Sequence, residues 1–198
     1  MTEQRIFDWE NIYKSNKMTD LPWYNPGLDV DLQDALEKMD LRSGTFLDLG
    51  TGPATQAMRL QELGFEVTGV DISEEAIQQA RQTYNELELM QDDILHTRLT
   101  KKFDFILDRG CFHVIDPNQR ETYVRNVINL LNVAGLLFLK CFSDQMPETG
   151  AGPYRFSRQM IRDIFEPHFS IVEIRDTEFL NDKNSGPIKS LFSIMKRR

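Results

Sequence analysis

Short apolar runs that alternate with helix-like stretches are the feature that most limits how this chain can fold. The runs lie at Phe46–Leu49, Glu66–Asp71, Leu87–Gln91, Phe103–Asp108 and Gly135–Phe142. Runs of this length suit buried strands, and the stretches between most of them carry apolar residues at helical spacing. This order predicts a largely parallel α/β sheet with helices on both faces.

The helices around these strands are expected to begin and end at recognisable residues. The second should start near Pro53, since proline suits a first turn, and stop at Gly64. Ser73 is expected to cap the third, and a short helix is expected near Ser157–Phe165. The apolar faces of the first and fourth helices should consist of Leu32, Ala35, Leu36 and Met39, and of Val124, Val127, Ile128 and Leu131.

The C-terminal part of the chain breaks the alternation. Two strand candidates, Phe169–Phe179 and Ile188–Arg197, are separated only by the turn-rich segment NDKNSGP. Such a segment predicts a hairpin, so at least one strand at this edge should run antiparallel. The expected fold is therefore a three-layer α/β sandwich around a mostly parallel, seven-stranded sheet with an antiparallel C-terminal edge hairpin.

Length and composition restrict the classes of function. A chain of 198 residues suits one domain, expected at residues 29–198, after an N-terminal segment of residues 1–28. The net charge of −8 argues against a nucleic-acid partner, because nonspecific binding to phosphates depends on Lys and Arg. With no apolar run near the roughly 20 residues of a membrane span and no signal-peptide layout, a cytoplasmic location without membrane contact is expected.

Cys111 and Cys141 are expected to be reduced core residues. Each is next to a phenylalanine, and neither belongs to a C-x-x-C pair or to a histidine-rich cluster. The sequence therefore predicts neither a disulfide framework nor a metal site.

Two closely spaced glycines, Gly50 and Gly52, join the first strand to the next helix. Ligands of open parallel α/β sheets bind beyond the carboxyl ends of the strands, where glycines let a ligand approach the backbone. Asp71, at the end of the second strand, is placed to bind ribose hydroxyls, which indicates an adenosine ligand. A dinucleotide site would need a third glycine at Thr55, and Asp48 suits a cationic group better than a pyrophosphate.

The turn resembles the first motif of the class I S-adenosylmethionine-dependent methyltransferases. That motif is approximately acid-x-Gly-x-Gly-x-Gly, and the chain reads DLGTGPA, with Ala54 in place of the third glycine. Asp71 in VTGVDIS matches the family's acid after strand two. Asp93 and Ile94 in MQDDIL match the acid and hydrophobic residue after strand three, with Asp92 as the alternative acid. The resemblance runs from about residue 29 to the C-terminus and implies a Rossmann-like fold.

The same resemblance implies which residues contact the methyl donor. The protein would bind S-adenosyl-L-methionine and release S-adenosyl-L-homocysteine, without a metal. Asp71 would contact the ribose, Asp93 the adenine amino group and Ile94 the adenine ring, while Trp23 or Tyr24 could offer a cation–π face to the sulfonium. The expected donor-binding residues are Asp48, Gly50, Gly52, Asp71, Ile72, Asp93, Ile94, Asp108 and Trp23.

A narrower resemblance concerns the acceptor. FDWENIYKSNKMTDLPWYN before the fold and DRGCFHVI after the fourth strand are similar to the small-molecule branch with thiopurine, thiol and halide, and tellurite-resistance methyltransferases. In that branch an N-terminal segment with tryptophans covers the donor. Residues 1–28 are thus expected to form a lid, and the acceptor to be a thiol, selenol, halide or similar small molecule. DRGC replaces the Asn/Asp-Pro-Pro-aromatic motif of adenine- and glutamine-modifying members, which argues against DNA modification.

No catalytic base is assigned by the sequence. In-line displacement at the methyl carbon gains most from alignment and from exclusion of water, and a thiolate or halide needs no base. Asp108 and His113 are the candidates for an acceptor that must lose a proton, although Asp108 and Arg109 could instead form a local ion pair. An NAD-dependent oxidoreductase and a noncatalytic S-adenosylmethionine-binding module are the alternative functions. Neither the acceptor nor the oligomeric state is specified.

Overall fold

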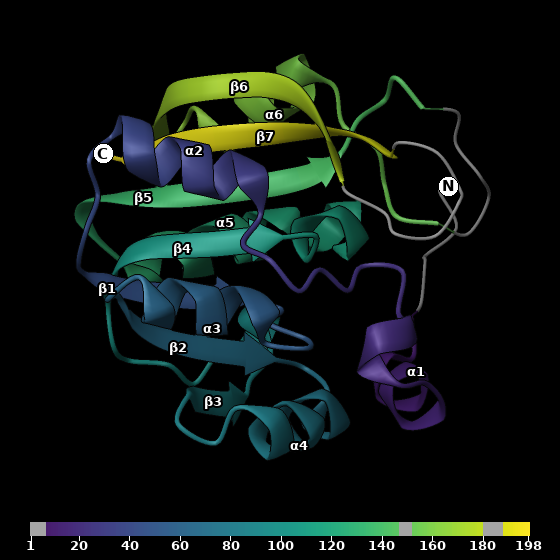
Figure 1. Ribbon diagram of the computed structural model, residues 1–198. Helices are drawn as coiled ribbons and strands as arrows, with labels where there is room; N and C mark the ends of the chain where they lie inside the picture. Colours follow the sequence, from purple (N-terminus) through teal and green to yellow (C-terminus); the bar gives the residue numbers. More distant parts are fainter. Residues whose placement is uncertain (1–6, 147–151, 180–187) are drawn as a thin grey trace.

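Seven strands form one sheet in the computed structural model, which describes residues 7–146, 152–179 and 188–198. The sheet order is β3-β2-β1-β4-β5-β7-β6 (Figure 1). Strands β1 to β5 pair in parallel, and β7 runs antiparallel to both of its neighbours, which confirms the predicted sheet. The segment 181–187, predicted to turn between β6 and β7, lies outside the described residues. The strands are β1 (Thr45–Leu49), β2 (Glu66–Asp71), β3 (Glu88–Gln91), β4 (Phe103–Arg109), β5 (Leu131–Phe142), β6 (Phe169–Phe179) and β7 (Ile188–Arg197).

Helices cover both faces of the sheet (Figure 1). Apolar residues of α2, α3 and α4 share one core cluster, and those of α5 and α6 share the other. Among the described residues, no helix is long and apolar enough to cross a membrane. The helices are α1 (Trp9–Ser15), α2 (Val30–Lys38), α3 (Thr55–Glu62), α4 (Glu74–Thr83), α5 (Arg120–Leu130) and α6 (Arg158–Phe165), with short 3-10 turns η1 (Met18–Asp20), η2 (Ile94–His96), η3 (Phe112–Val114) and η4 (Pro117–Gln119).

Two residues at predicted helix ends differ from expectation. Met39 is the C-cap of α2 and is 36% exposed, so the buried stripe ends one turn earlier. Leu131 opens β5 instead of closing α5, because its extended backbone pairs with Phe103 of β4. Helical spacing alone could not reveal this, since Leu131 is buried in either arrangement.

Helix α1 lies beside the carboxyl ends of the parallel strands (Figure 1). Glu10 of α1 accepts hydrogen bonds from the Ser73 hydroxyl, at 2.7 Å, and from the Glu75 backbone N–H, at 3.1 Å. These groups belong to the N-terminus of α4, whose dipole favours a carboxylate, and Ser73 also caps the helix as predicted. The contacts lower the pKa of Glu10 to about 2. These hydrogen bonds therefore hold the N-terminal segment next to the edge of the sheet where ligands of this fold bind.

Candidate active site

A cavity of about 400 Å³ lies at the carboxyl ends of the strands. Its size is in the range of sites that bind small ligands. It extends from the ends of β3 and β2, past the turn after β1, to the ends of β4 and β5 and the start of β7. Seven of the predicted residues line it: Trp23, Gly50, Asp71, Ile72, Asp93, Ile94 and His113.

The glycine turn has the backbone that its sequence requires. Gly50 and Gly52 have φ of 71° and 49°, where residues with side chains are rarely found. A Cβ on Gly52 would lie 2.6 Å from the hydroxyl oxygen of Tyr13, and one on Gly50 would lie 3.1 Å from Cβ of Cys111. Ala54, in the place of the family's third glycine, also has positive φ, at 55°. The two glycines thus let the side chains of Tyr13 and Cys111 pack closely against the turn, and of the two it is Gly50 that lines the cavity.

Asp71 faces this turn from the end of β2. Its carboxylate accepts hydrogen bonds from the backbone N–H groups of Gly52, at 2.9 Å, and Ser73, at 3.0 Å. Burial raises the pKa of Asp71 to about 6. The hydrogen bonds lower the pKa, because they favour the ionised form, but the effect of burial is larger. The carboxylate is thus held at the cavity wall with acceptor capacity left for ligand hydroxyls.

Asp48 and Asp108 do not line the cavity and instead hold its loops in place. Asp48 accepts a hydrogen bond of 2.5 Å from the Thr51 hydroxyl, within the glycine turn. Asp108 is fully buried and accepts hydrogen bonds from the Tyr123 hydroxyl, at 2.5 Å, and from three successive N–H groups, those of residues 110–112. Burial raises the pKa of each carboxyl to about 6. Both side chains are positioned as anchors rather than as ligand contacts.

Three carboxylates lie on the cavity wall near β2 and β3. Asp92 and Asp93 join Asp71 there, and Ile94 follows them on η2. Asp93 caps η2 through the Leu95 N–H, at 2.9 Å, whereas Asp92 accepts a hydrogen bond of 2.7 Å from the Thr97 hydroxyl. This end of the cavity is therefore acidic, with an apolar side chain between the acids and the core.

Aromatic residues of the N-terminal segment form another wall of the cavity. Trp9, Tyr13 and Trp23 line it, while Tyr24 does not. The Trp23 indole N–H donates to the Tyr13 hydroxyl, at 3.3 Å, and the Trp23 ring packs edge-on to Trp9 with centroids 5.8 Å apart. Tyr13 was not predicted as a site residue. Its spacing of four residues from Trp9 on α1 could have suggested it, because such residues share a helix face.

His113 lines the cavity near the end of β4, with its ring nitrogen Nδ1 accepting the Phe142 backbone N–H at 3.3 Å. Burial, with the positive charges of Arg155 and Arg109, lowers the pKa of His113 to about 3. The ring is neutral at physiological pH, and its bonding at Nδ1 leaves the proton on Nε2. His113 is therefore arranged as a hydrogen-bond donor and is a weak base. Asp108, with both oxygens occupied, is no better placed.

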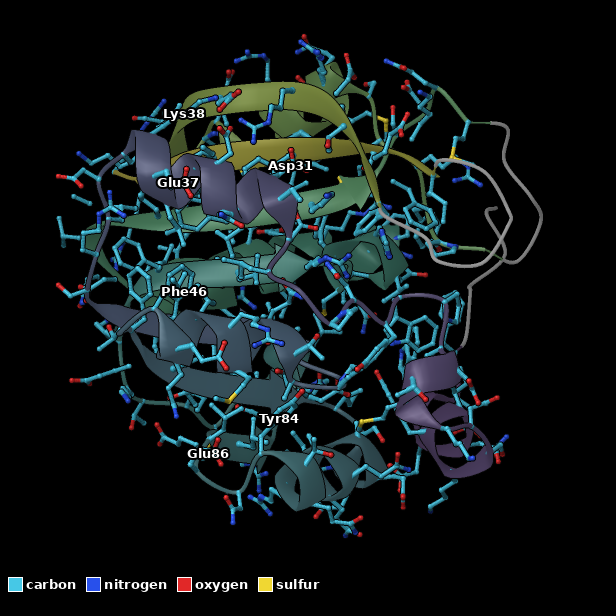
Figure 2. The ribbon with its side chains drawn as sticks, in the orientation of Figure 1. Asp31, Glu37, Lys38, Phe46, Tyr84 and Glu86 are labelled. Atoms are coloured by element: carbon cyan, nitrogen blue, oxygen red, sulfur yellow. The ribbon has the colours of Figure 1, made fainter. Side chains whose placement is uncertain are left out.

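Arg109 pairs with Asp29 rather than with its neighbour Asp108, which contradicts the local ion pair considered from the sequence. Arg109 Nε lies 2.7 Å from Asp29, and its Nη1 donates to the Trp23 carbonyl at 3.2 Å. Lys140 of β5, almost fully buried, contacts Asp29 at 2.9 Å and Asp31 at 2.6 Å. Figure 2 shows Asp31 at the end of α2 opposite Lys38. This buried network joins the N-terminal segment to β4 and β5.

The two cysteines are free, but they have different surroundings. Cys141 is buried in the core as predicted, whereas Cys111 is half-buried on the cavity wall beside Gly50. Burial raises the pKa of the Cys111 thiol well above its usual value, so it stays protonated. Over the part of the chain that the structure describes, no cluster of metal-binding side chains is present.

The chain is similar to known methyltransferases. Residues 46–135 match the family described as methyltransferase domain. An uncharacterized methyltransferase of Schizosaccharomyces pombe is 35% identical over 114 residues, which are 55% of this chain and 76% of that protein. Thiocyanate methyltransferase 1 of Brassica oleracea is 27% identical over 165 residues, 80% of this chain and 73% of that protein.

A solved structure agrees in fold. The crystal structure of a SAM-dependent methyltransferase from Methanosarcina mazei superposes with a TM-score of 0.73 at 19% identity, covering 86% of this chain and 98% of that one. Gly50 and the carboxylates of Asp71, Asp92 and Asp93 line one cavity at the carboxyl ends of the strands of this fold. The chain therefore belongs to the class I S-adenosylmethionine-dependent methyltransferases.

Proposed function

We propose that this enzyme transfers the methyl group of S-adenosylmethionine to a small-molecule acceptor such as a thiol, selenol or halide. The observation that carries this proposal is the cavity with its aromatic wall. Its volume of about 400 Å³ suits a small acceptor next to the donor, and the aromatic residues Trp9, Tyr13 and Trp23 form one of its walls. Thiocyanate methyltransferase 1, which is named for a small anion as its substrate, is similar to this protein over most of the chain.

We propose that the donor lies along the ends of β3, β2 and β1. Asp71 would accept hydrogen bonds from the ribose, Asp93 would bind the adenine amino group, and Ile72 and Ile94 would pack on the adenine. The backbone at Gly50 and Gly52 would border the methionine portion. Asp48 and Asp108 would act indirectly, by holding the glycine turn and the loop after β4.

Residues 1–28 are proposed to act as a lid. Once bound, the donor supplies an electrophilic methyl group on a positively charged sulfur. The aromatic wall excludes water and aligns the acceptor with that methyl group, and alignment is the main source of rate in such a displacement. Because neither His113 nor Asp108 is arranged as a base, the acceptor is expected to react in its deprotonated form. A cytoplasmic location and the lack of a nucleic-acid partner remain predictions.

Two measurements test the proposed function. Calorimetric titration should give binding of S-adenosylhomocysteine and no comparable binding of NAD. Incubation with methyl-labelled S-adenosylmethionine should transfer label to at least one member of a panel of thiols, selenols, halides, phenols and amines. Affinity for NAD alone would support the oxidoreductase, and donor binding without transfer to any acceptor would support the noncatalytic module.

Replacing Trp23 with leucine should weaken binding of S-adenosylmethionine roughly 2- to 30-fold more than binding of S-adenosylhomocysteine. Only the former carries the positive sulfur, and a cation–π contact is worth about 0.5 to 2 kcal/mol. Titrations of both ligands with the wild type and the variant measure the difference. Tyr24→Leu is the matched control, since Tyr24 does not line the cavity. Equal losses for the two ligands would show that Trp23 serves only packing.

A further inference from the structure

Arg155 is a largely buried cation, two of whose three guanidinium nitrogens lack a hydrogen-bonded partner among the described residues. Its side chain is 9% exposed, and its Nε and Nη1 have no acceptor among the described residues. Buried arginines are normally paired, because an isolated charge loses its hydration. An unsatisfied group of this kind calls for an explanation, and a ligand that the protein binds during its function is one.

The guanidinium of Arg155 lies beside the end of the cavity near β4 and β5, opposite the proposed donor site. We call this the acceptor end. It stands 5.5 Å from the ring centroid of Phe142, which lines the cavity together with Pro153, two residues before Arg155. Its charge also acts on His113, whose ring lies 4.4 Å from that of Phe142. Arg155 is thus next to the wall rather than on it, and its flexible stem lets the head group reach past the edge of the ring.

Charge is distributed unevenly along the cavity. The carboxylates of Asp71, Asp92 and Asp93 lie at the end near β2 and β3, whereas Arg109 and His113 line the end near β4 and β5. Arg109 is already paired with Asp29, and His113 is neutral with its Nε2 proton available. Behind the Phe142 ring, Arg155 adds a further positive charge, which forms no ion pair with any carboxylate of the described residues.

We propose that the methyl acceptor carries a carboxylate or similar oxyanion, which Arg155 and the Nε2–H of His113 bind at the Phe142 end of the cavity. Guanidinium and N–H donors suit the oxygens of such a group. The aromatic rings of Phe142 and Phe179 beside it favour an acceptor whose remaining part is apolar. This inference rests on the proposed function and deepens it by naming the acceptor class.

Arg155 lies too far from the donor site to contact the reacting atom of the acceptor. It would instead bind a group at the other end of the acceptor molecule. Gly50 follows β1, and Phe142 ends β5, two strands away in the sheet. With strands spaced about 4.8 Å apart, the Phe142 end lies on the order of 10 Å from the glycine turn. An acceptor that spans this distance can place its nucleophile at the donor while its oxyanion meets Arg155. Arg155 is thus a specificity-determining residue.

The test uses benzoate as a probe and benzamide as its neutral counterpart. Both are titrated, by calorimetry or ligand-observed NMR, into the full chain saturated with S-adenosylhomocysteine. Benzoate should bind the wild type more tightly than benzamide does. Arg155→Met should lower the affinity for benzoate at least tenfold and leave the affinity for benzamide unchanged. Arg155→Lys should retain part of the affinity. Arg158→Met is the matched control, because it removes the same charge from a half-exposed side chain three residues away.

Folding and donor binding are checked on the same variants. Arg155→Met should melt no lower than the wild type, since it removes a buried charge whose Nε and Nη1 have no hydrogen-bonded partner among the described residues. Equal binding of benzoate and benzamide to the wild type, no benzoate binding at all, or benzoate affinity within twofold of wild type in Arg155→Met would each overturn the proposal. If the proposed function itself were wrong, the wild type would not bind S-adenosylhomocysteine, and this outcome is distinct from the benzoate results.

Discussion

Asp71→Asn is expected to weaken binding of S-adenosylhomocysteine by roughly 10- to 150-fold at pH 8. The substitution removes the negative charge that would accept hydrogen bonds from the ribose, and such bonds to a charged group are worth about 1.5 to 3 kcal/mol. It also weakens the bond that draws the Gly52 N–H toward β2. Calorimetric titration measures the change, with Glu66→Gln at the exposed start of the same strand as control.

The dependence on pH gives this prediction a second test. Because the pKa of Asp71 is raised to about 6, the carboxyl is ionised at pH 8 and becomes protonated as the pH falls below 6. Wild-type affinity should therefore decline toward acid pH, and the difference between wild type and Asp71→Asn should shrink. A difference that stays constant between pH 8 and pH 5 would argue that the charge of Asp71 does not contact the ligand.

Lys140→Met is expected to reduce the free energy of unfolding by about 3 to 5 kcal/mol. Lys140 contacts two buried carboxylates, Asp29 and Asp31, and removing one member of a buried ion pair leaves uncompensated charge. Burial tends to raise the pKa of Asp29, but Lys140 and Arg109 hold it below its usual value. Urea denaturation at neutral pH measures the loss.

The control for this variant is Lys38→Met on the same helix as Asp31. Lys38 and Asp31 lie at opposite ends of α2 (Figure 2), and the Lys38–Asp34 pair is exposed. An exposed pair of this kind contributes less than about 1 kcal/mol. If Lys140→Met cost no more than Lys38→Met, then Arg109 and Arg175 would suffice to neutralise the two carboxylates.

The parts of the molecule that sequence reasoning predicted well are those with a local cause. Strand β2 was predicted with its observed bounds, and Ser73 caps α4 as expected, because apolar runs and caps act over a few neighbouring residues. Gly50 and Asp71 could be placed together because parallel strands end at the same edge of the sheet.

The parts that were missed depend on residues far apart in the chain. Lys140 was the one charge in the apolar run GLLFLKCF, yet its partner Asp29 is 111 residues away. Arg155 stands in a loop without periodic pattern, and only the fold shows that it is buried without an acceptor. Asp108 resembles a family contact residue, but only the structure reveals that its oxygens are occupied by the following loop.

Different segments of the chain form the two ends of the cavity. The end of the cavity that we propose for the donor is built from residues between Gly50 and Leu95, inside the segment 46–135 that matches the methyltransferase family. Phe142, Pro153 and Phe179 on the acceptor side come from later segments, outside that match. If acceptors are bound as we propose, relatives can change their acceptor preference through these later segments while keeping the donor-binding part of the matched segment.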